Sequence, residues 1–159
     1  MTATAHALIG ASIAAKVINP AIGIPLAIIS HFIADMIPHW DAGTNHKKKT
    51  KIRLGLEATL DVLLGFALVF LLFRNTVKPD YLFTMVIAAQ LPDWLKTPSD
   101  VFGLHVPPFS WLDWLSHKTQ WRMQLPWGLV TQIVVVGIIL FLALAPNLSF
   151  DQILAAQIH

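Results

Sequence analysis

The sequence predicts an all-α fold, a polytopic helical bundle embedded in a membrane. Of the 159 residues, 55% are hydrophobic and 13% are charged, whereas a soluble domain carries about 25% charged residues. This composition excludes a disordered chain, a coiled coil and an ordinary water-soluble domain. The length suits one integral membrane domain that covers residues 1–159. The net charge of +2 is too small and too dispersed to indicate nucleic-acid binding.

Five apolar segments are expected to form membrane-embedded helices: residues 3–17, 21–37, 54–73, 79–95 and 125–145. The first two are short for a hydrocarbon layer of about 30 Å, and Pro20 and Pro38 limit them. The fourth has a proline in its first turn and is expected to kink at Pro92. Residues 109–117 predict a short amphipathic helix that lies in the membrane interface.

Basic residues predict the orientation of these segments. Eight lie in the connections that follow the second and fourth segments, and three lie on the opposite side. Because lysine and arginine are enriched in cytoplasmic loops, we expect a multi-pass protein of the cell inner membrane with a cytoplasmic N-terminus and an external C-terminus. All six tryptophans lie in or next to the same cytoplasmic connections, as anchors in the lipid interface: Trp40, Trp94, Trp111, Trp114, Trp121 and Trp127.

Histidine and carboxylate side chains gather at the same cytoplasmic depth. His31, Asp35 and His39 recur every four residues and share one helix face until Pro38. Carboxylates inside a membrane oppose insertion, by up to about 3 kcal/mol each, and repel one another. The second, third and fifth segments contain no lysine or arginine, so a divalent cation is the better compensation. The chain has no cysteine, so such a metal would be held by His, Asp or Glu.

These observations predict a hydrolase with a metal site in the cytoplasmic leaflet. Zn²⁺ suits a site rich in histidine, and Mn, Fe or Mg would also bind nitrogen and oxygen ligands. Glu57 is the candidate general base. Lys118 and Arg122 would bind the anionic head group of a phospholipid or another phosphoester, with Trp111 and Trp114 at its entry. The candidate metal ligands are His6, His31, Asp35, His39, Asp41, Asp61, Asp93 and His117.

Two other classes of function stay open. In a proton- or ion-coupled transporter, Asp35, Glu57 and Asp61 would form a relay with His31, and the short helices would require a homodimer to complete the path. In a structural protein, the same polar groups would only join helices. A hydrogen-bonded pair of His31 and Asp35 would then be sufficient.

The motif His31-x3-Asp35-x2-Pro38-His39-x-Asp41, preceded by Thr-Ala-His6, resembles a family of small prokaryotic inner-membrane proteins known as membrane-bound metal-dependent hydrolases. The resemblance covers roughly residues 1–120 and implies a helical membrane protein with ligand-type positions at His6, Asp35, His39 and Asp41. Family members often carry a His-Arg-Gly-x-Thr-His-Ser turn. The nearest match here, Ser-His-Lys-Thr at residues 116–119, has one histidine and no glycine.

Overall fold

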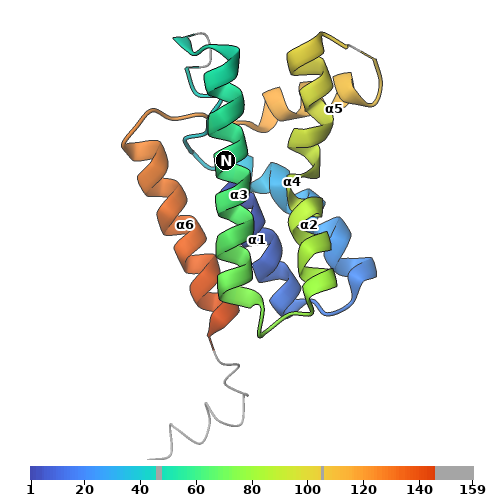
Figure 1. Ribbon diagram of the computed structural model, residues 1–159. Helices are drawn as coiled ribbons and strands as arrows, with labels where there is room; N and C mark the ends of the chain where they lie inside the picture. Colours follow the sequence, from blue (N-terminus) through green and yellow to red (C-terminus); the bar gives the residue numbers. More distant parts are fainter. Residues whose placement is uncertain (46–47, 105, 146–159) are drawn as a thin grey trace, which may run out of the picture.

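The computed structural model describes residues 1–45, 48–104 and 106–145, and within these ranges the chain forms six α-helices and no β-strand (Figure 1). An all-helical fold is therefore confirmed. The helices are α1 (Ala3–Lys16), α2 (Pro20–Asp35), α3 (Lys51–Phe73), α4 (Pro79–Phe102), α5 (Phe109–Thr119) and α6 (Trp127–Leu144).

Side-chain caps fix where the first three helices begin. Thr2 accepts a hydrogen bond from the amide of Ala5, Asn19 caps α2 and Thr50 caps α3 in the same way. A capping oxygen satisfies an amide that has no partner within the helix, so these residues set the start of each element. The segment 109–119 is helical, which confirms the helix expected there.

The short helix α1 lies at the centre of the bundle and contacts α2, α3, α4 and α6. Its alanine- and glycine-rich sequence allows this, because small side chains let neighbouring backbones approach closely. A Cβ atom added at Gly10 would lie 2.7 Å from the Met85 carbonyl oxygen and 2.8 Å from the Ala89 Cβ atom. The close packing of α1 on α4 brings polar side chains from distant parts of the sequence together.

Two helices, α3 and α6, are long and apolar enough to cross a membrane, so the expectation of about five membrane-embedded helices is corrected. Helix α1 has 14 residues and is buried by its neighbours, and α2 has 16 residues. Helix α4 has 24 residues but contains Asp80, Asp93 and Lys96, which lower its hydropathy. It also continues through Pro92 as one helix. Apolar composition therefore marks burial within the bundle as well as contact with lipid.

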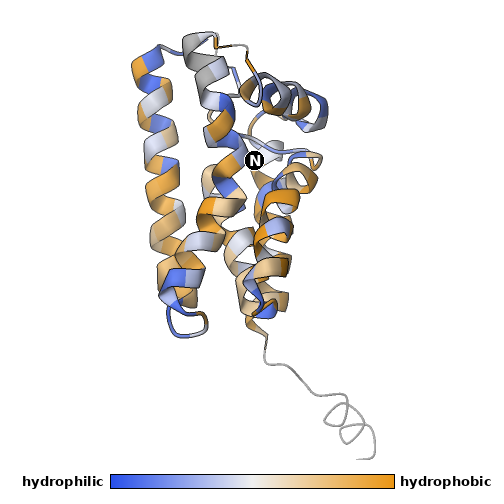
Figure 2. Ribbon diagram, turned by 90° about the vertical axis from the view of Figure 1, so that its right-hand side faces the viewer, coloured by the Kyte–Doolittle hydropathy of each residue, from blue (hydrophilic) through white to orange (hydrophobic). Residues whose placement is uncertain are grey.

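Polar segments gather at one end of the bundle. The connection between α2 and α3, helix α5 and the segment that leads to α6 lie at this end, and the α3–α4 connection lies at the other (Figure 1). Figure 2 shows that hydrophobic residues dominate the helices between the two ends. On α5, Trp111 and Trp114 are exposed and Ser116 is buried, so one face of this helix is free to lie in a lipid interface.

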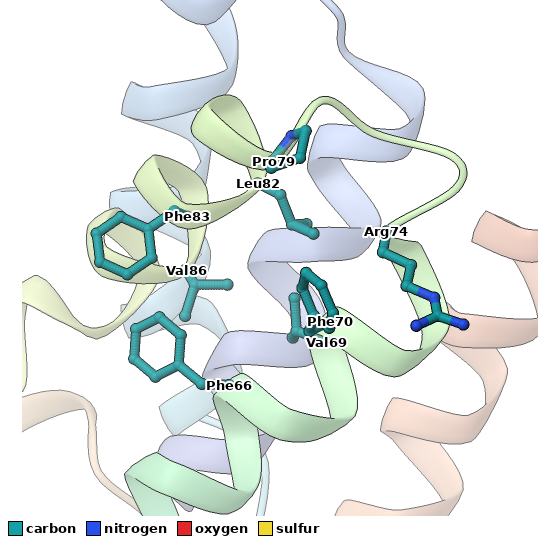
Figure 3. A pocket seen from close by; sticks show the side chains of 8 residues that line it. All are labelled: Phe66, Val69, Phe70, Arg74, Pro79, Leu82, Phe83 and Val86. Carbon is teal, nitrogen blue, oxygen red and sulfur yellow. The ribbon is translucent and has the colours of Figure 1, made fainter.

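A small hollow with a volume of about 200 Å³ lies between α3 and α4, near the connection that joins them. Phe66 and Phe83 line it with ring centroids 5.4 Å apart, and Arg74 lies at its edge (Figure 3). The guanidinium of Arg74 also lies 5.9 Å from the ring centroid of Phe70.

Candidate metal centre

Three histidines point their Nε2 atoms toward the carboxylate of Asp35. The Nε2 atom of His6 lies 3.2 Å from Asp35 Oδ1, that of His31 lies 3.7 Å from Oδ2, and that of His39 lies 3.7 Å from Oδ1. All four side chains are buried, with at most 1% of their surface exposed. His31 and Asp35 lie in the last turns of α2, His39 follows beyond the end of this helix, and the central helix α1 adds His6.

Backbone carbonyls orient two of these imidazoles. The Nδ1 atom of His31 lies 2.9 Å from the carbonyl oxygen of Ala89, and that of His39 lies 2.8 Å from the carbonyl oxygen of Ile37. A carbonyl oxygen only accepts hydrogen bonds, so each Nδ1 carries the proton and donates it. In the neutral imidazole the lone pair is then on Nε2 and faces the cluster, as in metal-binding histidines, where the second nitrogen is fixed by such a contact.

Asp93 of α4 adds a second carboxylate to the cluster. Its Oδ1 atom lies 3.4 Å from the Nε2 atom of His31, whose ring stacks on that of His6 with centroids 4.0 Å apart. The ligand atoms of His6, His31 and Asp93 all lie within 4.8 Å of one another. Asp93 also pairs with Lys96 at 2.6 Å, and 29% of its side chain is exposed. It is therefore the most accessible carboxylate near these histidines.

The segment between α5 and α6 docks along the end of α2 through backbone hydrogen bonds. The Trp121 amide donates to the Asp35 carbonyl at 2.9 Å, and the His39 amide donates to the Trp121 carbonyl at 3.0 Å. This pairing brings the Nε2 atom of Gln120 to 3.3 Å from Asp35 Oδ2. It also brings the Nε atom of Arg122 to 3.0 Å from Asp41 Oδ2.

Asp41 lies at the edge of the cluster. Its Oδ2 atom is 3.9 Å from the Nε2 atom of His39, while its Oδ1 atom accepts a hydrogen bond of 2.9 Å from Thr44. Together with the contact from Arg122, these interactions hold both carboxylate oxygens. Asp41 thus connects the cluster to Arg122, whose side chain is one-third exposed.

Three predicted site residues have partners elsewhere. Asp61 accepts hydrogen bonds from the amides at the start of α1. Glu57 pairs with Lys49 and Arg53 at 2.6 and 2.8 Å, so the structure does not bring the candidate general base to the cluster. His117 is 70% exposed and lies 3.2 Å from Asp113 on its own helix, outside the cluster.

The predicted substrate-binding residues separate into two groups. Arg122 lies at the cluster, whereas Lys118, Trp111 and Trp114 lie on the exposed surface of α5. Sequence reasoning missed Gln120, because a glutamine in a connection carries no local signal and only the pairing with α2 brings it to Asp35. The pairing of Glu57 did have a signal, since Arg53 precedes it by four residues, the spacing of helical ion pairs.

Asp35 has one cationic partner, whereas the three imidazole nitrogens that face it have no hydrogen-bond partner. The α-ammonium group of Met1 contacts Asp35 Oδ1, whereas the Nε2 atoms of His6, His31 and His39 have no hydrogen-bond partner. Burial lowers the pKa of His39, which favours its neutral imidazole. Neutral imidazoles can each supply one ligand to a cation.

The spacing of these atoms fits a metal site. Two ligand atoms on a tetrahedral zinc ion lie about 3.3 Å apart when each zinc–ligand distance is about 2.0 Å. The contacts between histidine nitrogens and carboxylate oxygens in the cluster measure 3.2 to 3.9 Å. Imidazole and carboxylate groups together suit Zn, Mn or Fe. No protein-family model, curated protein or solved structure matches this chain.

Proposed function

We propose that the protein is a membrane-embedded, metal-dependent hydrolase whose metal is held by histidines and carboxylates at the polar end of the bundle. The observation that carries this proposal is the set of three buried Nε2 atoms without hydrogen-bond partners, all directed at the carboxylate of Asp35. The resemblance of the His31–Asp41 motif to membrane-bound metal-dependent hydrolases points to the same class of chemistry.

A divalent cation would remove the repulsion between these donor atoms. A neutral imidazole with its proton on Nδ1 presents a lone pair at Nε2, and this lone pair faces the negative oxygens of Asp35. A buried polar atom without a partner costs about 1–3 kcal/mol. His6, His31 and Asp93, whose ligand atoms lie within 4.8 Å of one another, would hold a divalent metal with Asp35 and His39 beside them, and the metal would remove these penalties together.

The metal, when bound, lowers the pKa of a coordinated water and polarises the bond to be cleaved. The carbonyl groups of Ala89 and Ile37 keep the imidazoles of His31 and His39 in one tautomer. Gln120 restrains the carboxylate of Asp35 through its side-chain amide. Asp93, with 29% of its side chain exposed and an ion pair with Lys96, is the cluster carboxylate that water would reach most easily.

The substrate class that we propose is a phospholipid or another phosphoester at the cytoplasmic leaflet. Arg122 supports it, because a guanidinium group binds phosphate through paired hydrogen bonds and this one lies beside Asp41 at the edge of the cluster. Exposed Trp111 and Trp114 on α5 support a location in the lipid interface. Helices α3 and α6 supply the apolar length for membrane insertion.

A packing-only role is the second candidate, and the Met1–Asp35 contact favours it. An ammonium group at Asp35 compensates one buried negative charge without any metal. In that case the polar cluster serves to join α1, α2 and α4. The two candidates differ in whether metal changes the stability of the protein.

Elemental analysis of the protein purified without added metal, followed by thermal unfolding with and without a chelator, separates them. For a metalloprotein we expect stoichiometric Zn, Mn or Fe and a loss of stability on chelation. The loss should approach about 2.7 kcal/mol if free metal stands at 100 times its dissociation constant. Release of phosphate or a lipid product from phospholipid vesicles should then depend on the same metal. Absence of metal, together with stability that a chelator leaves unchanged, would favour the packing-only role.

A further inference from the structure

Lys96 of α4 holds its ammonium group beside the candidate metal centre. Its Nζ atom lies 2.6 Å from the Oδ1 atom of Asp93, and the same oxygen lies 3.4 Å from the Nε2 atom of His31. Because both contacts share this oxygen, the ammonium group is no more than about 6 Å from the histidine nitrogen. Only 12% of the Lys96 side chain is exposed. Lysine side chains are mostly exposed to water, so this one is held near the cluster at a cost in hydration.

The ammonium group and a metal would draw on the same carboxylate. In the structure, Asp93 Oδ1 compensates the positive charge of Lys96. A divalent metal at His6, His31 and Asp93 would share this negative charge, because the ligand atoms of the three residues lie within 4.8 Å of one another. Metal binding would therefore leave Lys96 with less compensation than Asp93 alone gives it.

The metal-loaded centre would carry more positive than negative charge. The carboxylates of Asp35 and Asp93 bring two negative charges, whereas a divalent metal and Lys96 bring three positive charges. The α-ammonium group of Met1, which contacts Asp35, adds a further positive charge. Neutral imidazoles add none. An excess of positive charge beside buried groups is costly unless an anion neutralises it.

A phosphate group is an anion that suits this position. Its oxygens bind a metal and accept hydrogen bonds from an ammonium group at the same time, and lysine and metal ions together stabilise phosphoryl groups in this way. Lysine acts as a point charge with three donors and does not need the planar, paired geometry of arginine. Arg122 approaches through Asp41, which contacts His39, so it borders a different part of the cluster and its charge is already paired.

We infer that Lys96 binds the phosphate group of the substrate beside the metal, and that its ammonium group turns from Asp93 toward this phosphate when both are bound. The inference rests on the proposed function, because the excess of positive charge arises only when a metal is present. It adds a second cationic residue to the phosphate site that Arg122 borders. The alternative is a purely structural ion pair, since a lysine three residues after an aspartate on a helix can pair with it by spacing alone.

Titration of inorganic phosphate into the full chain tests this role of Lys96. The protein is kept in micelles of a detergent without phosphate groups, and calorimetry measures phosphate affinity with metal bound and after chelation. Lys96→Gln removes the charge and should weaken phosphate binding roughly 10–100-fold, the effect of one charged hydrogen bond. Its metal affinity should be unchanged or higher, because Lys96 no longer competes for Asp93. Lys96→Arg keeps the charge and should retain most of the phosphate affinity.

Lys51→Gln is the matched control. It removes the same charge from an exposed side chain at the start of α3, at the same end of the bundle. Its phosphate affinity should equal that of the wild type. For a structural ion pair, Lys96→Gln would tighten metal binding and leave phosphate affinity unchanged, and that result would overturn the inference. Equal losses of phosphate affinity in the two glutamine variants would also overturn it, since they would reflect only the net charge of this end.

Competition distinguishes a lipid head group from a soluble phosphate as the natural ligand. Short-chain phosphatidic acid and methyl phosphate carry the same phosphate group, and each is added to the metal-loaded protein with inorganic phosphate bound. Displacement by the lipid alone indicates a membrane substrate, and equal displacement by both indicates a soluble phosphoester. Either result supports the inference when Lys96→Gln weakens the displacing ligand as it weakens inorganic phosphate.

Failure of this inference and failure of the proposed function give different results. Stoichiometric metal with phosphate binding that is absent, or that does not depend on Lys96, keeps the metal centre and refutes the role of Lys96. A purified protein that contains no metal and binds none on addition refutes the proposed function. Phosphate binding that depends on Lys96 in such a protein would keep Lys96 as an anion-binding residue, and its absence there would overturn both.

Discussion

Asp61 on α3 caps the central helix: its Oδ2 atom accepts a hydrogen bond of 2.6 Å from the backbone amide of Ala3. Its Oδ1 atom accepts a second from the amide of Thr4 at 3.1 Å, and the Thr4 hydroxyl donates to the Asp61 carbonyl. A carboxylate at a helix N-terminus satisfies amides that have no helical partner and opposes the positive end of the helix dipole. Asp61 thereby holds the helix that carries His6.

Asp61→Asn should therefore weaken the fold without removing the metal. We expect a loss of about 1–2 kcal/mol in the free energy of unfolding, because a neutral amide oxygen replaces a charged acceptor at the start of α1. Denaturant titration in detergent measures this loss. Metal content at saturation should equal that of the wild type, because both Asp61 oxygens are directed at backbone amides.

Thr59→Ala is the control for this variant, since Thr59 is exposed two residues earlier and its hydroxyl donates a hydrogen bond within α3. It should change stability by no more than about 0.5 kcal/mol. An Asp61→Asn protein of normal stability that no longer binds metal would restore Asp61 to the ligand set that its sequence position indicates.

Replacement by alanine should have a large effect at His31 and little effect at His117. His31→Ala removes a buried imidazole that contacts Ala89 and two carboxylates, so both metal content and metal-dependent stabilisation should fall. His117→Ala changes an exposed side chain and should alter stability by less than about 0.5 kcal/mol with full metal retention. Elemental analysis and thermal unfolding with a chelator measure both quantities.

Because His31→Ala also leaves a cavity, His31→Gln provides a second variant that keeps a polar side chain of similar length. If His31→Gln folds and still binds metal as tightly as the wild type, His31 is not a ligand. If His117→Ala loses the metal, the histidine of α5 belongs to the site and the cluster described here is incomplete.

Local sequence patterns predicted the part of the cluster that α2 provides. His31 and Asp35 lie on one face because they are one helical turn apart, whereas α2 ends at Asp35 and His39 joins them through backbone hydrogen bonds with Trp121 and Met123. That His6 and Asp93 lie near these residues could be predicted only from the depth expected for them in a membrane. Their actual contacts depend on the close approach of α1 and α4 at Gly10.

The rest of the site depends on long-range pairing that sequence periodicity does not encode. Gln120 and Arg122 reach Asp35 and Asp41 because the chain after α5 forms backbone hydrogen bonds with the end of α2. The number of spanning helices was overestimated for a related reason. The small apolar residues of α1 are buried by other helices, and hydropathy alone does not separate that environment from lipid.

Gln120→Ala should weaken metal binding while leaving its stoichiometry intact. The Gln120 amide donates to Asp35 Oδ2 and restrains a carboxylate that all three histidines face. Loss of such a supporting hydrogen bond commonly lowers metal affinity by about 10–100-fold. Competition with a chromogenic chelator measures the affinity.

Gln124→Ala is the matched control, since Gln124 lies on the same segment but bonds with Asn45 at an exposed position. Its metal affinity should equal that of the wild type. Equal affinities for both variants would show that Gln120 does not position Asp35, and equal losses would indicate that the whole segment, rather than one amide, supports the cluster.

Gly10→Ala should disturb both the packing of α1 on α4 and the metal centre. The added Cβ atom would lie 2.7 Å from the Met85 carbonyl oxygen and 2.8 Å from Ala89 Cβ, too close for either atom to stay in place. Displacement of α4 moves the Ala89 carbonyl, which holds the Nδ1 proton of His31. We expect a loss of about 1–3 kcal/mol in stability from overpacking, together with weaker metal binding.

Gly137→Ala is the control on α6, where an added Cβ atom meets nothing within 4 Å. That variant should gain up to about 1 kcal/mol from helix propensity and keep its metal affinity. A Gly10→Ala protein that loses stability but binds metal as the wild type does would separate the two effects, and the orientation of His31 would then not depend on the contact between α1 and α4.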